Sequence, residues 1–132
     1  MNQIKAHITK IEASNNITIV SFEVGKQPMK MMALEINDNL KVGSEVILGA
    51  KATNIALAKE TLTEISISNQ LEAIIESIEM GTLLCSVNFL FEGVCWESVI
   101  TRDSASRMNL VVGERVVALL KSSELSILEL VS

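Results

Sequence analysis

The stretch Asn2-Gln3-Ile4-Lys5-Ala6 returns as Asn69-Gln70-Leu71-Glu72-Ala73, 67 positions later in the chain. The same spacing carries Ile11-Glu12 onto Ile78-Glu79. Self-similarity at a fixed spacing is the signature of a structural unit that occurs more than once. We therefore expect these stretches to open two copies of one module with the same local structure.

The later parts of the two copies match at a slightly larger spacing. Leu40-Lys41-Val42-Gly43 returns as Leu110-Val111-Val112-Gly113, and Lys51-Ala52-Thr53 returns as Lys121-Ser122-Ser123, both 70 positions on. The second copy therefore has extra residues between its anchors. The duplication predicts two domains, residues 1–62 and residues 63–132.

Within each copy the apolar residues alternate with polar ones, a pattern typical of half-buried β-strands. Turn-forming residues separate these runs and indicate short connections between strands. About five short strands per copy predict an all-β protein of two small five-stranded barrels. The alternating sets are Ile4, Ala6 and Ile8; Ile17 and Ile19; Met32, Leu34 and Ile36; Val46, Leu48 and Ala50; Leu71, Ala73 and Ile75; Leu83, Cys85 and Val87; Val94 to Thr101; and Val116 to Leu120. The turns are Ser14-Asn15-Asn16, Gly25-Lys26-Gln27-Pro28, Asn37-Asp38-Asn39, Gly81 and Glu92-Gly93.

One short helix is predicted, in the second copy only. The segment from Asp103 to Met108 follows a predicted strand, and the Asp103 carboxylate is placed to cap the free N–H groups that open a helix. The first copy has no room for such a segment. This helix therefore explains the difference in length between the copies.

The composition predicts a globular protein with a well-filled core. Hydrophobic residues make up 48% of the 132 residues and charged residues 20%, which excludes disorder through lack of apolar surface. No apolar run approaches the roughly 18 residues that a membrane-spanning helix needs. Met1 to Lys5 do not resemble the start of a secretory signal, so we expect a cytoplasmic protein.

The charge balance predicts which partners the chain avoids. A net charge of −5 argues against a sequence-independent nucleic-acid surface, and three Phe and one Trp offer little for base stacking. We expect neither nucleic acid nor membrane as a partner. A module of half this length is marginally stable alone, so association into a homo-oligomer is expected.

The reactive residue types form no catalytic or metal-binding pattern. Cys85 and Cys95 are expected to be buried small hydrophobes, and with one histidine they match no structural zinc spacing. His7 is expected to be an ordinary strand residue. The sequence contains no phosphate loop and no nucleophile elbow, so we predict that the protein is not an enzyme.

These residues resemble the molybdenum-binding Mop proteins, a branch of the TOBE family with an OB-like barrel, in the tandem two-module (diMop) form. The resemblance covers both copies. It implies binding of molybdate or tungstate between packed modules, no catalysis, and a closed oligomer, with a trimer favoured. Its most specific stretches are Ile65-Ser66-Ile67-Ser68-Asn69-Gln70-Leu71, Ile100-Thr101-Arg102-Asp103-Ser104, Leu110-Val111-Val112-Gly113-Glu114 and Lys121-Ser122-Ser123.

The predicted site residues are those that can hold a tetrahedral dianion with local donors, namely hydroxyls, amides, lysine and backbone N–H groups in turns. In an acidic protein the overall field does not attract such an ion. The candidates are Ser66, Ser68, Asn69, Ser104, Lys121, Ser122 and Ser123 in the second copy, and Asn2, Lys51, Ala52 and Thr53 in the first.

The sequence also departs from the family pattern. Ser68 stands where the family usually has Arg, and the first copy lacks both the preceding Ser-Ala-Arg and a helix serine equivalent to Ser104. The alternative function is therefore a non-catalytic interaction or regulatory scaffold with degenerate anion sites. Ser, Thr and Asn at strand ends also form turns and caps, and Lys51 and Lys121 can extend from a barrel rim into solvent. A nucleic-acid or carbohydrate binder is a further, less favoured alternative.

Overall fold

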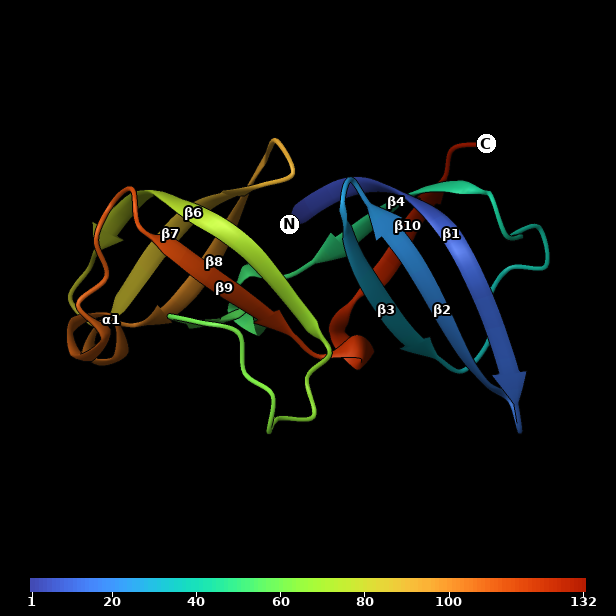
Figure 1. Cartoon of the computed structure of the whole chain (residues 1–132), viewed down its shortest axis with the longest axis horizontal. Helices are drawn as coiled ribbons and strands as arrows, with labels where there is room; N and C mark the ends of the chain where they lie inside the picture. The colour runs from blue at the N-terminus through green and yellow to red at the C-terminus, as the bar shows by residue number, and fades with distance from the viewer.

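The computed structural model describes all residues from Met1 to Ser132 and contains two curled antiparallel sheets side by side (Figure 1). The prediction of two tandem five-stranded OB-like modules, with one short helix in the second, is confirmed. The elements are β1 (Asn2–Ser14), β2 (Ile17–Val24), β3 (Gln27–Ala33), β4 (Glu45–Ala50), η1 (Ala52–Asn54), β5 (Ala56–Ala58), β6 (Asn69–Met80), β7 (Leu84–Phe91), β8 (Val94–Thr101), α1 (Arg102–Met108), β9 (Arg115–Leu120), η2 (Ser122–Glu124) and β10 (Ser126–Leu130).

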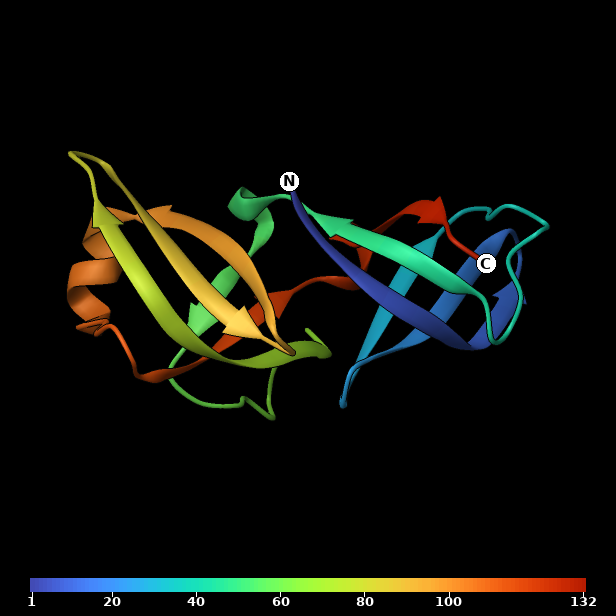
Figure 2. The ribbon, with the colours of Figure 1, turned by 90° about the horizontal axis from the view of Figure 1, so that it is seen from above.

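Each sheet takes its fifth strand from the other copy. The first sheet has the order β10-β4-β1-β2-β3 and the second the order β5-β9-β6-β7-β8. β10 therefore closes the first module and β5 the second, as the red and green strands show (Figure 2). The predicted division between residues 62 and 63 follows the two sequence copies, whereas each sheet of the structure contains strands from both.

β1 and β6 curl the sheets because each is long and bulged. The register against the next strand shifts between Ile8 and Lys10 in β1 and between Ile75 and Ser77 in β6, the same place in the repeat. A bulge bends a strand and increases its twist. One half of β1 therefore pairs with β4 and the other half with β2, and β6 does the same with β9 and β7.

The tight turns follow the predicted chemistry. Asn15 and Asn16 have φ values of 51° and 67°, and Glu92 and Gly93 have 47° and 76°. Two-residue hairpin turns require this left-handed backbone, which Asn and Gly adopt most easily. At Gln27 and Pro28 the expectation was wrong: only Gly25 and Lys26 turn, and β3 begins at Gln27.

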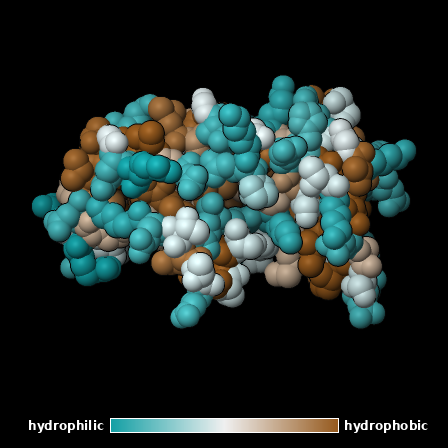
Figure 3. Space-filling view, in the orientation of Figure 1, coloured by the Kyte–Doolittle hydropathy of each residue, from teal (hydrophilic) through white to brown (hydrophobic).

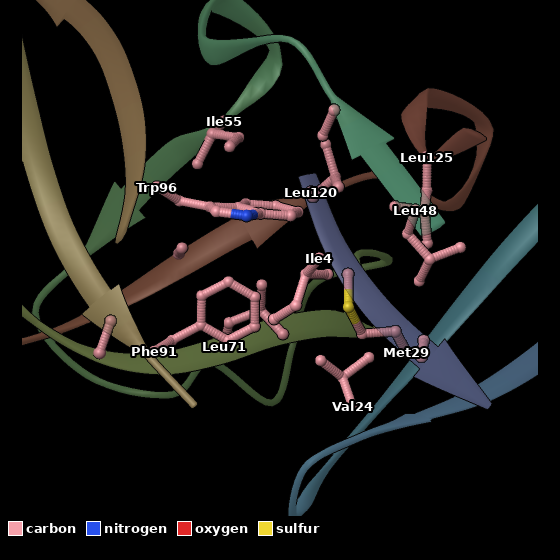
Figure 4. Packing of buried hydrophobic residues seen from close by; sticks show 14 of the residues in the cluster. Ile4, Val24, Met29, Leu48, Ile55, Leu71, Phe91, Trp96, Leu120 and Leu125 are labelled. Atoms are coloured by element: carbon pink, nitrogen blue, oxygen red, sulfur yellow. The ribbon is translucent and has the colours of Figure 1, made fainter. Parts of the chain in front are cut away.

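A single apolar cluster of 26 buried residues runs through both modules. Figure 4 shows Trp96 and Leu120 of the second module close to Ile4 and Met29 of the first. Trp96 also donates from Nε1 to the carbonyl of Gln3 at 3.0 Å. The modules therefore share one hydrophobic core and are not independent domains joined by a linker.

The predicted buried face was wrong in β2 and β3. Ile17 and Ile19 are 38% and 37% exposed, and Met32 and Leu34 are exposed too. The buried face instead carries Thr18, Val20, Phe22 and Val24 in β2 and Met29 and Met31 in β3. Both faces of these strands carry apolar residues, so alternation alone does not settle which faces the core.

Three smaller expectations were also wrong. Leu83 is exposed, whereas Cys85 and Val87 of the same predicted set are buried. Cys95 is exposed, although Cys85 is buried as expected and both are free thiols. The helix is present, but its N-cap is Thr101, whose side chain accepts a hydrogen bond from the backbone N–H of Ser104. Asp103 lies inside the first turn because the helix begins at Arg102.

Candidate functional site between the modules

Two short helical turns from different copies meet between the modules. η1 follows β4 and has Lys51 as its N-cap, and η2 follows β9 and has Lys121 as its N-cap. The Asn54 side chain at the end of η1 donates from Nδ2 to the Glu124 carboxylate at the end of η2, at 3.0 Å. The two segments that matched at a spacing of 70 residues in the sequence are therefore neighbours in space.

A hollow of about 210 Å³ lies beside this contact and is lined by residues of both copies. Its lining includes Lys51, whose side chain carries an ammonium group, and Ser123 and Ser126, whose side chains carry hydroxyls. Lys51, Ser123 and Ser126 are all exposed, so a ligand reaches them from solvent. The complete lining is Met1, Gly49, Ala50, Lys51, Asn54, Ser123, Glu124 and Ser126.

The strand register decides what stands next to each lysine. Asn2 pairs with Ala50, which places Met1 beside Lys51. Asn69 pairs with Leu120, which places Ser68 beside Lys121. The neighbour is thus apolar in the first copy and a hydroxyl in the second.

The two predicted asparagines fasten the modules together. Asn69 accepts from the Lys30 backbone N–H at 2.7 Å and donates to the Lys30 carbonyl at 2.8 Å. Asn2 makes the equivalent pair of bonds with the backbone of Glu97, both at 2.8 Å. Their carboxamides therefore bind backbone groups across the module interface. This is a structural role of the kind expected for polar residues at strand ends, and it leaves these carboxamides engaged with backbone.

The other predicted residues fall in three places. Ala52, Thr53 and Ser122 lie in η1 and η2 beside the hollow, although none of them lines it. Ser66 is exposed in the segment between β5 and β6. Ser104 lies in α1 at the outer end of the second module, away from η1 and η2 (Figure 1), where its hydroxyl bonds Thr101 and Arg107.

Sequence reasoning missed the three other residues of the hollow with polar side chains, namely Asn54, Glu124 and Ser126. A signal for the first two was present, because Asn54 and Glu124 occupy equivalent positions at the end of the matched Lys-containing segments. Ser126 lies on β10, which enters the first module only through the exchange of strands. The comparison of the two repeats therefore could not predict that Ser126 lines this hollow.

Further polar contacts join the two modules outside the hollow. Gln27 accepts from the backbone N–H of Glu72 at 2.8 Å, and the Glu92 carboxylate accepts from the backbone N–H of Lys26 at 2.7 Å. The hydrogen bond from the Lys26 backbone, followed by that from the Gln27 side chain, lowers the pKa of Glu92 below its ordinary 4.5. A comparable bond from Lys59 lowers the pKa of Glu114 within the second module.

The fold and the site define a two-module β-barrel protein with a polar hollow between its modules. Residues 65–127 match the family model of the TOBE domain, so this segment of the chain belongs to the TOBE domain family. No curated protein matches the sequence. None of the helices is long and apolar enough to cross a membrane.

Two solved structures are similar to the chain. The first is ModG, a cytoplasmic molybdate-binding protein whose structure contains bound molybdate. It is 21% identical with a TM-score of 0.89, and the match covers 96% of this chain and 94% of ModG. The second is a molybdate-binding protein from Sporomusa ovata, 34% identical with a TM-score of 0.49, over 51% of this chain and 100% of that protein.

Proposed function

We propose that this protein binds molybdate or tungstate in the cytoplasm, as a carrier or store, and performs no catalysis. The observation that carries the proposal is the hollow lined by Lys51 of one copy and by Ser123 and Ser126 of the other. The names of the similar structures, both molybdate-binding proteins, favour this class of ligand. The family resemblance implies a site between packed modules, and the lining of this hollow by residues of both copies supports that location.

The donors suit a fully deprotonated tetrahedral oxyanion. Such an ion accepts hydrogen bonds but offers no proton, and hydroxyl, ammonium and backbone N–H groups all donate. Lys51 supplies the positive charge, and Ser123 and Ser126 supply hydroxyls that rotate to suit the oxygens.

An equivalent site in the second copy follows from the repeat. Thr53 matches Ser123, Lys121 matches Lys51, and Ser68 stands where the first copy has Met1. We infer that these three residues form a related site. Ser104 lies in α1, apart from both sites (Figure 1), and would reach an anion only where another chain packs against it.

A closed homo-oligomer, with a trimer favoured, belongs to the same proposal. Ile17 and Ile19 on β2, Met32 on the neighbouring strand β3 and Leu34 just after β3 expose apolar surface. Brown apolar areas also interrupt the hydrophilic surface over both modules (Figure 3). Association would cover such surface. Light scattering of the purified protein measures its mass, and a monomer at micromolar concentration would contradict this part.

Isothermal titration with molybdate, tungstate, sulfate and phosphate tests the binding proposal. We expect saturable heat with molybdate or tungstate and none with phosphate. Lys51→Ala and Ser123→Ala should each weaken binding about tenfold or more, because each removes a bond to a charged ligand. Lys121→Ala reports on the second site.

Lys41→Ala is the matched control, since Lys41 is an exposed lysine outside the hollow. It should leave the affinity within about twofold, whereas an equal loss in both lysine variants would indicate a general charge effect. A folded protein that gives no heat with any anion contradicts the carrier proposal. The scaffold alternative would then remain.

A further inference from the structure

Glu124 brings a negative charge into the hollow that is proposed to bind an anion. It is the only acidic residue of the lining, and it stands next to Ser123 in η2. Its carboxylate accepts the hydrogen bond from Asn54 Nδ2. A carboxylate at this position is unfavourable for the binding of an anion, because the two negative charges repel each other.

The carboxylate opposes binding in two ways. It repels a bound anion directly, and this Coulomb energy is proportional to the charge of the anion. It also occupies an N–H of Asn54, a neutral donor that would otherwise be available to the oxyanion. Both effects lower affinity and leave the shape of the hollow unchanged.

The first copy shows the neutral alternative at the same position of the repeat. The residue equivalent to Glu124 is Asn54, which donates a hydrogen bond where Glu124 only accepts one. The module therefore accommodates an uncharged side chain here. The acidic residue of the second copy is not needed to form the turn.

We propose that Glu124 is the residue that sets the affinity and the charge preference of this site. Its carboxylate keeps the affinity for a dianion low enough for ready release, and it disfavours dianions more strongly than monoanions of the same tetrahedral shape. The inference rests on the proposed function, because it concerns the same hollow. A carrier or store must release its ion, and a fixed opposing charge is a direct way to ensure this.

Titration of Glu124→Gln with molybdate and with perrhenate, a tetrahedral monoanion, tests the inference. Molybdate should bind about tenfold more tightly than to the unchanged protein, and perrhenate only about threefold, because the repulsion scales with ligand charge. Glu124→Asn, which copies Asn54, should act in the same direction. Thermal melts of both variants should match the unchanged protein and so exclude a folding effect.

Glu129→Gln is the matched control, because it removes an exposed charge from β10 outside the hollow. It should change the molybdate affinity less than about twofold at physiological salt. If the unchanged protein binds molybdate and Glu124→Gln binds it no more tightly, or gains equally for perrhenate, the inference is wrong and the proposed function stands. If neither protein binds molybdate at millimolar concentration, the proposed function fails as well.

Discussion

Asn2 binds the backbone of Glu97 with the same pair of hydrogen bonds that Asn69 makes to the backbone of Lys30. Each bond pair joins the first strand of one module to the third strand of the other. The copies are therefore related by an approximate two-fold exchange, in which each serves the other in the same way. The contact between Asn54 and Glu124 lies in the same interface, where equivalent residues of η1 and η2 meet.

Asn69→Ala should lower the free energy of unfolding by about 2 kcal/mol, because it removes a buried side chain that pairs with both the backbone N–H and the carbonyl of Lys30 across the interface. Asn69 is 1% exposed, whereas Asn2 is only half-buried, so Asn2→Ala should cost less. Urea denaturation measures both. Asn39→Ala, at an exposed turn, should stay within about 0.5 kcal/mol, and an equal effect of all three variants would contradict this reading.

Ser98→Ala should also destabilise the protein, by about 1–3 kcal/mol. The Ser98 hydroxyl donates to the carbonyl of Ile55 at 2.6 Å, and both residues are buried. Its loss leaves that carbonyl unsatisfied at the end of η1. The thermal midpoint should fall relative to Ser14→Ala, which removes an exposed hydroxyl. Equal midpoints for the two variants would show that the hydrogen bond contributes nothing.

Thr101→Val should lower the free energy of unfolding by about 1 kcal/mol, the usual effect of losing an N-cap side chain. Valine keeps the shape but removes the oxygen that accepts from the Ser104 N–H. Asp103→Asn removes only a favourable charge near the helix N-terminus and should cost a few tenths of a kcal/mol. Chemical denaturation compares them, and a larger effect of the Asp103 variant would restore it as the cap.

Glu92 should make stability depend on pH in the acidic range. The bonds from Lys26 and Gln27 lower its pKa in the folded state below the ordinary 4.5. The stabilisation is therefore complete above pH 4.5 and is lost as the pH falls through the lowered value. In Glu92→Gln the fall of the thermal midpoint below pH 4.5 should be shallower. Glu79→Gln, at the exposed end of β6, should keep the original slope.

Much of the module could be predicted from the repeat. A match such as Leu40 to Gly43 with Leu110 to Gly113 forces equal backbone in both copies, and both glycines have φ near +90°. The turn at Asn15 and Asn16 was equally clear, because few residues tolerate a left-handed backbone. The inward face of β2 was not, because Ile17 and Ile19 are as apolar as the buried Val20 and Phe22.

The candidate site was only partly predictable. The matched segments led to Lys51 and Ser123, which line one hollow. They did not reveal that these residues come from opposite copies, or that the Asn2 and Asn69 side chains bind backbone. Such contacts depend on how the modules pack. The sequence does not distinguish an asparagine that binds backbone at a strand end from one that binds a ligand there.

The sequence by itself determined the repeated module, which is a five-stranded barrel that occurs twice. It also determined the short helix in the longer second copy. Local rules suffice for this, because strand periodicity and turn geometry act between neighbours in the chain. Only the tertiary structure decided that β5 and β10 change places. The last strands of the two copies are similar in pattern, so the repeat does not show which module each one joins. In the structure the exchange accompanies a shared core that includes Ile4, Met29 and Trp96. The hollow between η1 and η2 is a consequence of that exchange.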